Sequence, residues 1–175
     1  MPRSDHEIDD YPFRTWILTV SESHRIRPPR EISAVVAWID LAQPRIDCVA
    51  SLGPMGGVQV EPFSSYEREA RQFAAAIGTV RPSAVESRRK WTNAARVLAT
   101  AWRISLNVEE NRIGIILPEP LRRAQELPDS GGTVVMFGLG EILEIWDVAK
   151  WNDFVRSVKK KGRAFAEALE EFRER

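Results

Sequence analysis

One pattern of turn and strand residues occurs twice in this chain. Residues 52–66 read LGPMGGVQVEPFSSY, and residues 137–151 read FGLGEILEIWDVAKW. Without a gap, the alignment pairs Gly53 with Gly138, Val58 with Leu143, Val60 with Ile145, Pro62 with Asp147 and Tyr66 with Trp151. Both copies place apolar side chains at every second position, which is the period of a half-buried strand. We therefore expect two copies of one supersecondary unit.

The segments around each copy extend the repeat. Before the glycines, IDCVASL and TVVMFGL are rich in β-branched and apolar residues and predict a preceding strand. After the second strand, Ser64 or Asp147 is placed to cap a helix, and Tyr66 or Trp151 would pack from its first turn onto the sheet. Further upstream, residues 16–32 and 103–122 each predict a strand, a polar turn and a short second strand. Pro29 and Pro118 then suit the first turn of a helix.

Helices are expected between the copies and after them. Residues 81–102 carry an apolar stripe at helical spacing, formed by Trp91, Ala94, Ala95, Leu98 and Trp102. The tail has a heptad seam with alternating spacings of four and three residues, formed by Trp151, Val155, Val158, Gly162, Phe165, Leu169 and Phe172. Two interpretations of the seam stay open: it packs on its own domain, or it pairs with another subunit.

Composition limits the classes of function. The formal net charge is zero, so the chain as a whole does not attract nucleic acid. The one cysteine, Cys48, lies in an apolar run and is expected in the core, and its isolation favours a reducing, cytoplasmic compartment. The polar start of the chain does not resemble a signal peptide, and no apolar run is long enough to span a bilayer. We expect no membrane association.

The sequence favours a protein without catalytic activity. His6 and His24 are the two histidines, and neither has metal-ligand spacing. The GPMGG and GLG turns lack the Lys and Ser/Thr of a phosphate-binding loop. Glu141 and Glu144 are expected to face solvent rather than to form an acid/base pair. We predict no enzyme, no cofactor, no metal site and no small-molecule substrate.

The segments ILPEPLRRAQELP and GGTVVMFGLGEILEIWDVAKW resemble the second half of the MraZ family, transcriptional regulators within the AbrB/SpoVT swapped-hairpin superfamily. The resemblance covers roughly residues 14–155 and is weaker in the first copy, where the layout and RIRPPREI carry it. It implies an α+β fold: a two-repeat swapped-hairpin β-barrel with connecting helices and a long C-terminal helix. It also implies rings of subunits that bind short direct repeats of DNA.

The resemblance divides the chain into four parts. Residues 13–80 would be the first AbrB/MraZ-like repeat, 81–103 a connecting helix, 104–152 the second repeat and 153–175 a helical tail. The family contacts DNA through an Asp-x-x-x-Arg motif. In the first copy Arg25 falls on the arginine but Ser21 replaces the aspartate, and in the second copy Glu110 falls on the acid but Gly114 replaces the arginine.

Each copy therefore keeps one member of the pair. The residues expected to contact double-stranded DNA are His24, Arg25, Arg27, Arg30 and, if the turn shifts, Arg112. Alternation would place Arg25 and Arg27 on one strand face, and guanidinium groups suit both phosphates and guanine edges.

The main interpretation is a cytoplasmic, nucleoid-associated, homo-oligomeric DNA-binding regulator. The alternative is a degenerate relative that keeps the barrel, no longer binds DNA and serves as an oligomerisation or partner-binding module.

Overall fold

A computed structural model describes residues 14–53, 56–77, 95 and 97–173, with the side chains of residues 76, 77, 139 and 163–173 outside that description. The elements in chain order are β1 (Arg14–Thr19), β2 (Arg25–Ile26), α1 (Ile32–Val35), β3 (Arg45–Leu52), β4 (Val58–Pro62), α2 (Phe63–Ile77), β5 (Trp102–Glu109), β6 (Arg112–Ile116), α4 (Glu119–Ala124), β7 (Thr133–Leu139), β8 (Ile142–Asp147) and α5 (Val148–Arg173). The fold is α+β, as predicted.

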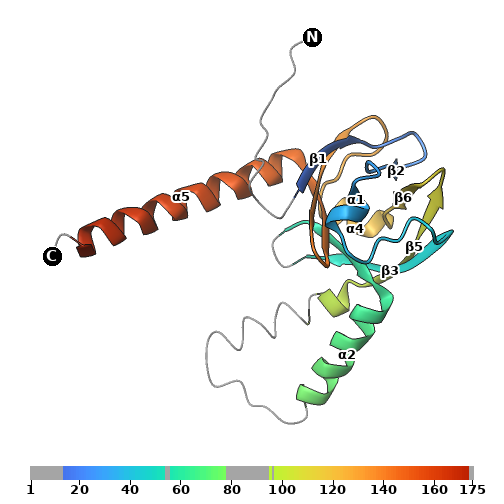
Figure 1. The fold of residues 1–175 in the computed structure, drawn as a ribbon, viewed down its shortest axis with the longest axis horizontal. Coiled ribbons are helices and arrows are strands. Elements are labelled where there is room, and N and C mark those ends of the chain that lie inside the picture. Colours follow the sequence, from blue (N-terminus) through green and yellow to red (C-terminus); the bar gives the residue numbers. More distant parts are fainter. Residues whose placement is uncertain (1–13, 54–55, 78–94, 96, 174–175) are drawn as a thin grey trace.

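The eight strands form one antiparallel, nearly closed barrel (Figure 1). Their order is β1-β7-β8-β4-β3-β5-β6-β2, so strand pairs of the first copy alternate with strand pairs of the second. β1 pairs with β7, and β3 pairs with β5 as well as with its own hairpin partner β4. A bridge between Val20 and Ile26 brings the two ends of this order together. The two copies thus share one barrel and do not form separate sheets.

The pairing of the copies has two-fold symmetry. β4 pairs antiparallel with β8, its aligned counterpart, and the ladder is centred on Gln59 opposite Glu144. These two residues also occupy the same position in the sequence alignment. β2 pairs in the same way with β6 through Ile26 opposite Ile115, which are equivalent when Pro29 is placed on Pro118. A pseudo-two-fold axis therefore passes through both pairs, and the internal duplication is a property of the structure.

Alternating side chains of the strands fill the barrel. Val60 and Ile145, predicted to be equivalent, are both fully buried in the same apolar core. Cys48 is fully buried beside them, as predicted. Burial, together with the nearby carboxyl groups of Asp47 and Glu61, raises the pKa of its thiol to about 12. A thiol with that pKa stays protonated and behaves as a small apolar side chain.

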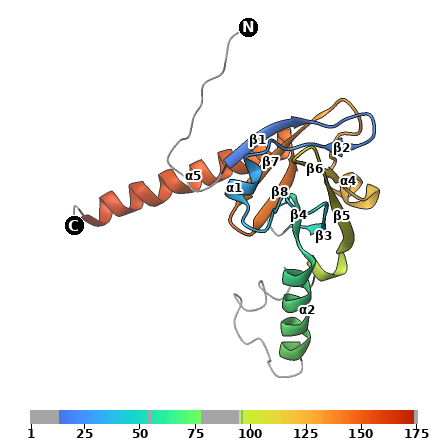
Figure 2. The same ribbon diagram turned by 45° about the vertical axis from the view of Figure 1, so that its right-hand side comes forward.

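A helix follows the second hairpin strand in each copy, and the two helices leave the barrel in different directions (Figures 1 and 2). Asp147 caps α5 as predicted, because its Oδ1 accepts the N–H groups of Ala149 and Lys150. Trp151 packs back from the first turn onto Phe137 of β7 and Trp146 of β8. In the first copy α2 begins at Phe63, so Ser64 lies inside the helix and is not its cap.

Two predictions concerning the outer face of the barrel are wrong. Glu144 does not face solvent: it is 6% exposed, and the indole N–H of Trp146 donates to its carboxylate at 2.8 Å. Trp102 does not end a helix, because it is the first residue of β5 and pairs with Ala50. Trp102 matched the helical spacing of the apolar stripe by coincidence. Pairing between strands distant in the sequence determines its structure and overrides the local helical pattern.

Several predictions concern residues outside this description. The structure does not describe residues 81–94 and 96 of the predicted connecting helix. It also does not describe the side chains of Phe165, Leu169 and Phe172 in the heptad seam. The seam therefore stays a prediction in its second half. Its first residue, Trp151, packs on the barrel, while Val158 is 51% exposed. In the part of the chain that can be described, no helix is long and apolar enough to cross a membrane.

Candidate nucleic-acid interface

Four of the five predicted DNA-contacting residues lie together around the β2–β6 strand pair. Arg25 and Arg27 do share one face, because both guanidinium groups donate to Oε2 of Glu109, at 2.8 and 3.3 Å. Arg25 is the more enclosed of the two, with 22% of its side chain exposed against 54% for Arg27. One carboxylate of β5 therefore partly neutralises two of the predicted DNA-contacting cations.

Gly114, which aligns with Arg25 in the sequence, has no room for a side chain of its own. A Cβ atom added at Gly114 would lie 2.9 Å from Cδ of Arg25, so the Arg25 side chain runs across the glycine. The two positions are equivalent in the sequence alignment and close to the pseudo-two-fold axis. Only one of them can carry a long side chain over this part of the barrel, and in this chain it is the first copy that does.

Arg30 and Arg112 lie near the tight turn between β5 and β6. Glu110 and Asn111 form that turn, both with positive φ, at 52° and 58°. These are the angles of a two-residue hairpin turn whose twist matches its strands. Arg30 donates to the backbone carbonyl of Glu110 at 3.1 Å. Arg112 follows the turn with an exposed side chain, and no ion pair joins it to another residue of the described ranges.

A groove runs along this surface between β1 and the segment that follows β2. Its volume is about 730 Å³. The lining consists of Thr15, Trp16, Ile17, Leu18, Arg27, Pro28, Pro29, Arg30, Glu31 and Arg112. Three arginines and one glutamate supply all of its charge, so the groove attracts anions.

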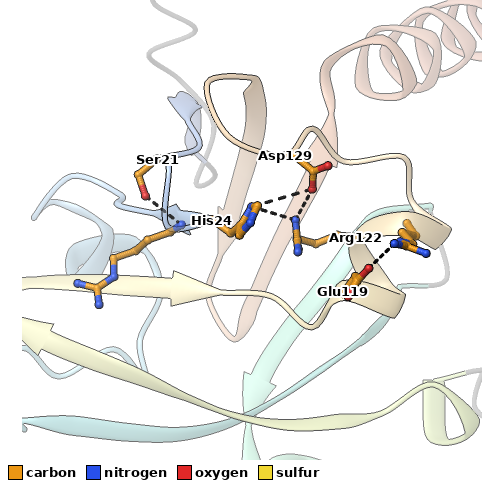
Figure 3. A network of polar contacts seen from close by, with 7 residues as sticks. Ser21, His24, Glu119, Arg122 and Asp129 are labelled. Carbon is orange, nitrogen blue, oxygen red and sulfur yellow. Dashed lines mark hydrogen bonds and ion pairs between the residues drawn. The ribbon is translucent and has the colours of Figure 1, made fainter.

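The fifth predicted residue, His24, belongs to a different network (Figure 3). Its Nδ1 lies 3.2 Å from Nη1 of Arg122, and Arg122 also donates to Asp129 at 2.6 Å. Because a guanidinium can only donate, this contact is a hydrogen bond in the tautomer whose Nδ1 is the acceptor. His24 also adopts a positive φ of 57° in the β1–β2 turn. Its side chain is 41% exposed and faces Arg122 and Asp129.

The residues that pair with Arg25, Arg27 and His24 were not predicted from the sequence. Glu109 follows Arg25 by 84 residues, and Arg122 follows His24 by 98, with Asp129 further along the chain. The available signal was the alternation of β5, which places Glu109 at a strand end beside the turn, but alternation does not tell which strand lies next to it. No cluster of three or more His, Cys, Asp or Glu side chains suited to a metal ion is found among the residues with described positions.

Comparison with known proteins does not assign the chain to a family. No family model matches the sequence, and no curated protein matches it.

Proposed function

We propose that this protein is a DNA-binding transcriptional regulator of the swapped-hairpin type, similar to MraZ. The observation that carries the proposal is the grouping of Arg25, Arg27, Arg30 and Arg112 on one surface of a two-fold barrel. The interleaved strand order supports the swapped-hairpin assignment, because each copy supplies strands that complete the other copy's sheet. The expected oligomer, by the same resemblance, is a ring of identical chains.

Local charge, and not net charge, would drive binding. The whole chain is neutral, but the groove carries three arginines against Glu31. Arginine contacts to phosphate release counterions, so affinity falls as salt rises, with a log–log slope of about −0.9 per phosphate contact. Four arginines on one chain therefore predict a slope of about −3 to −4 per subunit engaged.

The experiment selects duplexes from a random pool with the full-length protein and then measures affinity against salt concentration. Arg112→Ala is expected to weaken binding and to reduce the salt slope by about one, because one phosphate contact is lost. Arg71→Ala is the matched control, since Arg71 is an exposed arginine of α2 that pairs with Glu67 on its own helix. Equal effects of the two substitutions would contradict the proposed site.

A second candidate function is partner binding without DNA. The observation in its favour is the engagement of Arg25 and Arg27 by Glu109, which leaves fewer cations for phosphates. In that case the barrel would be a degenerate oligomerisation or partner-binding module. It would shift no duplex even at low salt, and Arg112→Ala would leave its assembly, measured by light scattering, unchanged.

A further inference from the structure

The barrel is open along one side of β1. β1 pairs with β7 on one side, while the only strand pairing recorded on its other side, within the described ranges, is the bridge between Val20 and Ile26. Pro28 and Pro29 follow soon after that bridge. Proline has no N–H group to extend a ladder, so the sequence itself prevents the barrel from closing here.

The open edge of β1 presents to the groove backbone groups that have no strand partner among the described residues. Val20 donates to the carbonyl of Gly132 and accepts from the N–H of Gly131, both at 2.8 Å, so its backbone groups face the β7 side. Alternate residues of an antiparallel strand direct these groups to opposite sides. Thr15 and Ile17 therefore direct theirs away from β7 and toward the groove, where an extended segment could add as a strand.

The groove also defines the chemistry of an occupant. Arg27, Arg30 and Arg112 line it opposite β1, with Glu31 as the one acidic residue of the lining. The side chain of Ile17 is 74% exposed. Proteins usually protect an edge strand with charged residues or a covering segment, so an exposed isoleucine on the open edge of β1 is unusual. A fitting occupant is extended, so that it pairs with β1, and carries carboxylates toward the arginines.

We propose that the N-terminal segment of the same chain, Asp5–Asp9, binds in this groove as a strand added to β1. Residues 1–13 lie outside the described ranges, but their sequence is known and they are joined directly to β1 at Arg14. Asp5, Glu7 and Asp9 occur at every second position, and in a strand their carboxylates share one face. Three carboxylates on one face complement the three arginines of the groove.

The connection to β1 favours binding within one chain. Residues 10–13 lie between Asp9 and Arg14, and a loop of four residues is a common length for a hairpin. The short tether keeps the segment at a high effective concentration beside the groove. If the proposed function is correct, on which this consequence rests, the segment competes with DNA for Arg27, Arg30 and Arg112 and lowers the affinity of the protein for DNA.

Amide hydrogen exchange of the full-length protein, followed by NMR without DNA, tests the docking. In the parent the amides of Thr15 and Ile17 are expected to be protected. In Asp5→Asn/Glu7→Gln/Asp9→Asn they exchange about tenfold faster or more, because the added strand is released. Trp16 and Leu18, which face β7, stay slow in both proteins and show that the barrel is intact. Asp10→Asn, which is off the alternating face, leaves all four amides as in the parent.

Two results would overturn the proposal, and a third would separate it from the proposed function. Rapid exchange of Thr15 and Ile17 in the parent rules out strand addition. Protection that disappears on dilution rules out docking within one chain and indicates a segment donated by a second copy. DNA binding is measured separately: the triple variant is expected to bind DNA more tightly. Docking without any effect on DNA would support the strand addition and count against the proposed DNA site.

Discussion

At the scale of single residues, Glu109 controls how much positive charge the β2–β6 surface offers. A single oxygen of its carboxylate, Oε2, accepts hydrogen bonds from both Arg25 and Arg27. Exposed ion pairs of this kind are weak, typically about 0.2–1 kcal/mol, so a DNA phosphate can compete for either arginine. If the proposed DNA site is correct, this acid adjusts the affinity for DNA and does not block binding.

Replacing this acid tests that interpretation. Glu109→Gln is expected to strengthen binding to a selected duplex about three- to tenfold, since both arginines are released and a repulsive charge is removed. Fluorescence anisotropy at fixed salt measures the change. Glu67→Gln, which frees Arg71 on α2, is the matched control and is expected to change nothing. Unchanged or weaker binding by Glu109→Gln would favour the partner-binding alternative.

Gly57 shows how closely the hairpin turn approaches a buried ring. A Cβ at this position would lie 2.6 Å from Nε1 of Trp146, whose indole is held by Glu144 and by the ring of Phe154. Gly57→Ala is expected to reduce the free energy of unfolding by about 1–3 kcal/mol through overpacking. Urea denaturation measures it.

Gly162 serves as the control for that substitution. It lies in α5, and a Cβ there would meet nothing within 4 Å. Gly162→Ala is expected to stabilise the protein by about 0.5–1 kcal/mol through helix propensity. A loss of stability in Gly162→Ala similar to that of Gly57→Ala would show that the effect does not come from the contact with Trp146.

At the scale of elements, the two equivalent helices are attached by different chemistry. In the second copy the rings of Trp146 and Phe154 lie 5.2 Å apart and fasten α5 to β8. The aligned positions in the first copy are Glu61 of β4 and Glu69 of α2. Glu61 is 5% exposed, and its Oε1 has no hydrogen-bond partner in the described ranges. A buried carboxyl group therefore lies in the first copy at the position where the second copy has the ring of Trp146.

A dependence of stability on pH follows from this carboxyl group. Burial, with added repulsion from Glu69, raises the pKa of Glu61 from 4.5 to about 7. The folded protein then holds this proton more tightly than the unfolded chain. The contribution to stability is fully present below about pH 4.5 and is lost as the pH rises through 7, by about 1–3 kcal/mol.

Urea denaturation at pH 5 and pH 8 measures this difference. Glu61→Gln is expected to reduce the pH dependence relative to the parent and to be the more stable protein at pH 8. Burial also raises the pKa of Glu144, which accepts a hydrogen bond from Trp146, so the parent includes a second contribution of the same sign. Only the difference between the parent and the variant reports on Glu61. Identical pH profiles would show that Glu61 is solvated in the folded protein.

At the scale of the whole molecule, neither copy can complete its sheet alone. β1 depends on β7 of the second copy, and β3 depends on β5. We expect fragments 1–80 and 95–175 to lack stable structure separately and to form the barrel when mixed. Circular dichroism of each fragment and of the mixture measures this. A folded isolated fragment would show that the interleaved pairing is dispensable.

Much of the local structure was predictable from the sequence. The alternation in VQVEP and LEIWD, the glycines before them and the aspartate cap of α5 are local signals, and the strands and the cap occur where those signals lie. The grouping of Arg25 with Arg27 was also predictable, because side chains two residues apart in an extended segment lie on the same side, although Arg27 directly follows β2 (Arg25–Ile26). The face of a strand on which a side chain lies depends only on residues beside it.

Other features required the tertiary structure. Three contacts depend on which strands are neighbours. Glu109 reaches Arg25, Arg25 covers Gly114, and Glu144 is buried beside Trp146. The sequence by itself determined a duplicated strand-turn-strand-helix unit and a set of arginines at the end of its first hairpin. Only the folded barrel decided how the copies interleave and which charged residues pair between them. The physical reason is that the periodicity of a sequence shows which side of a strand a residue faces, but not which residue of another strand it contacts there.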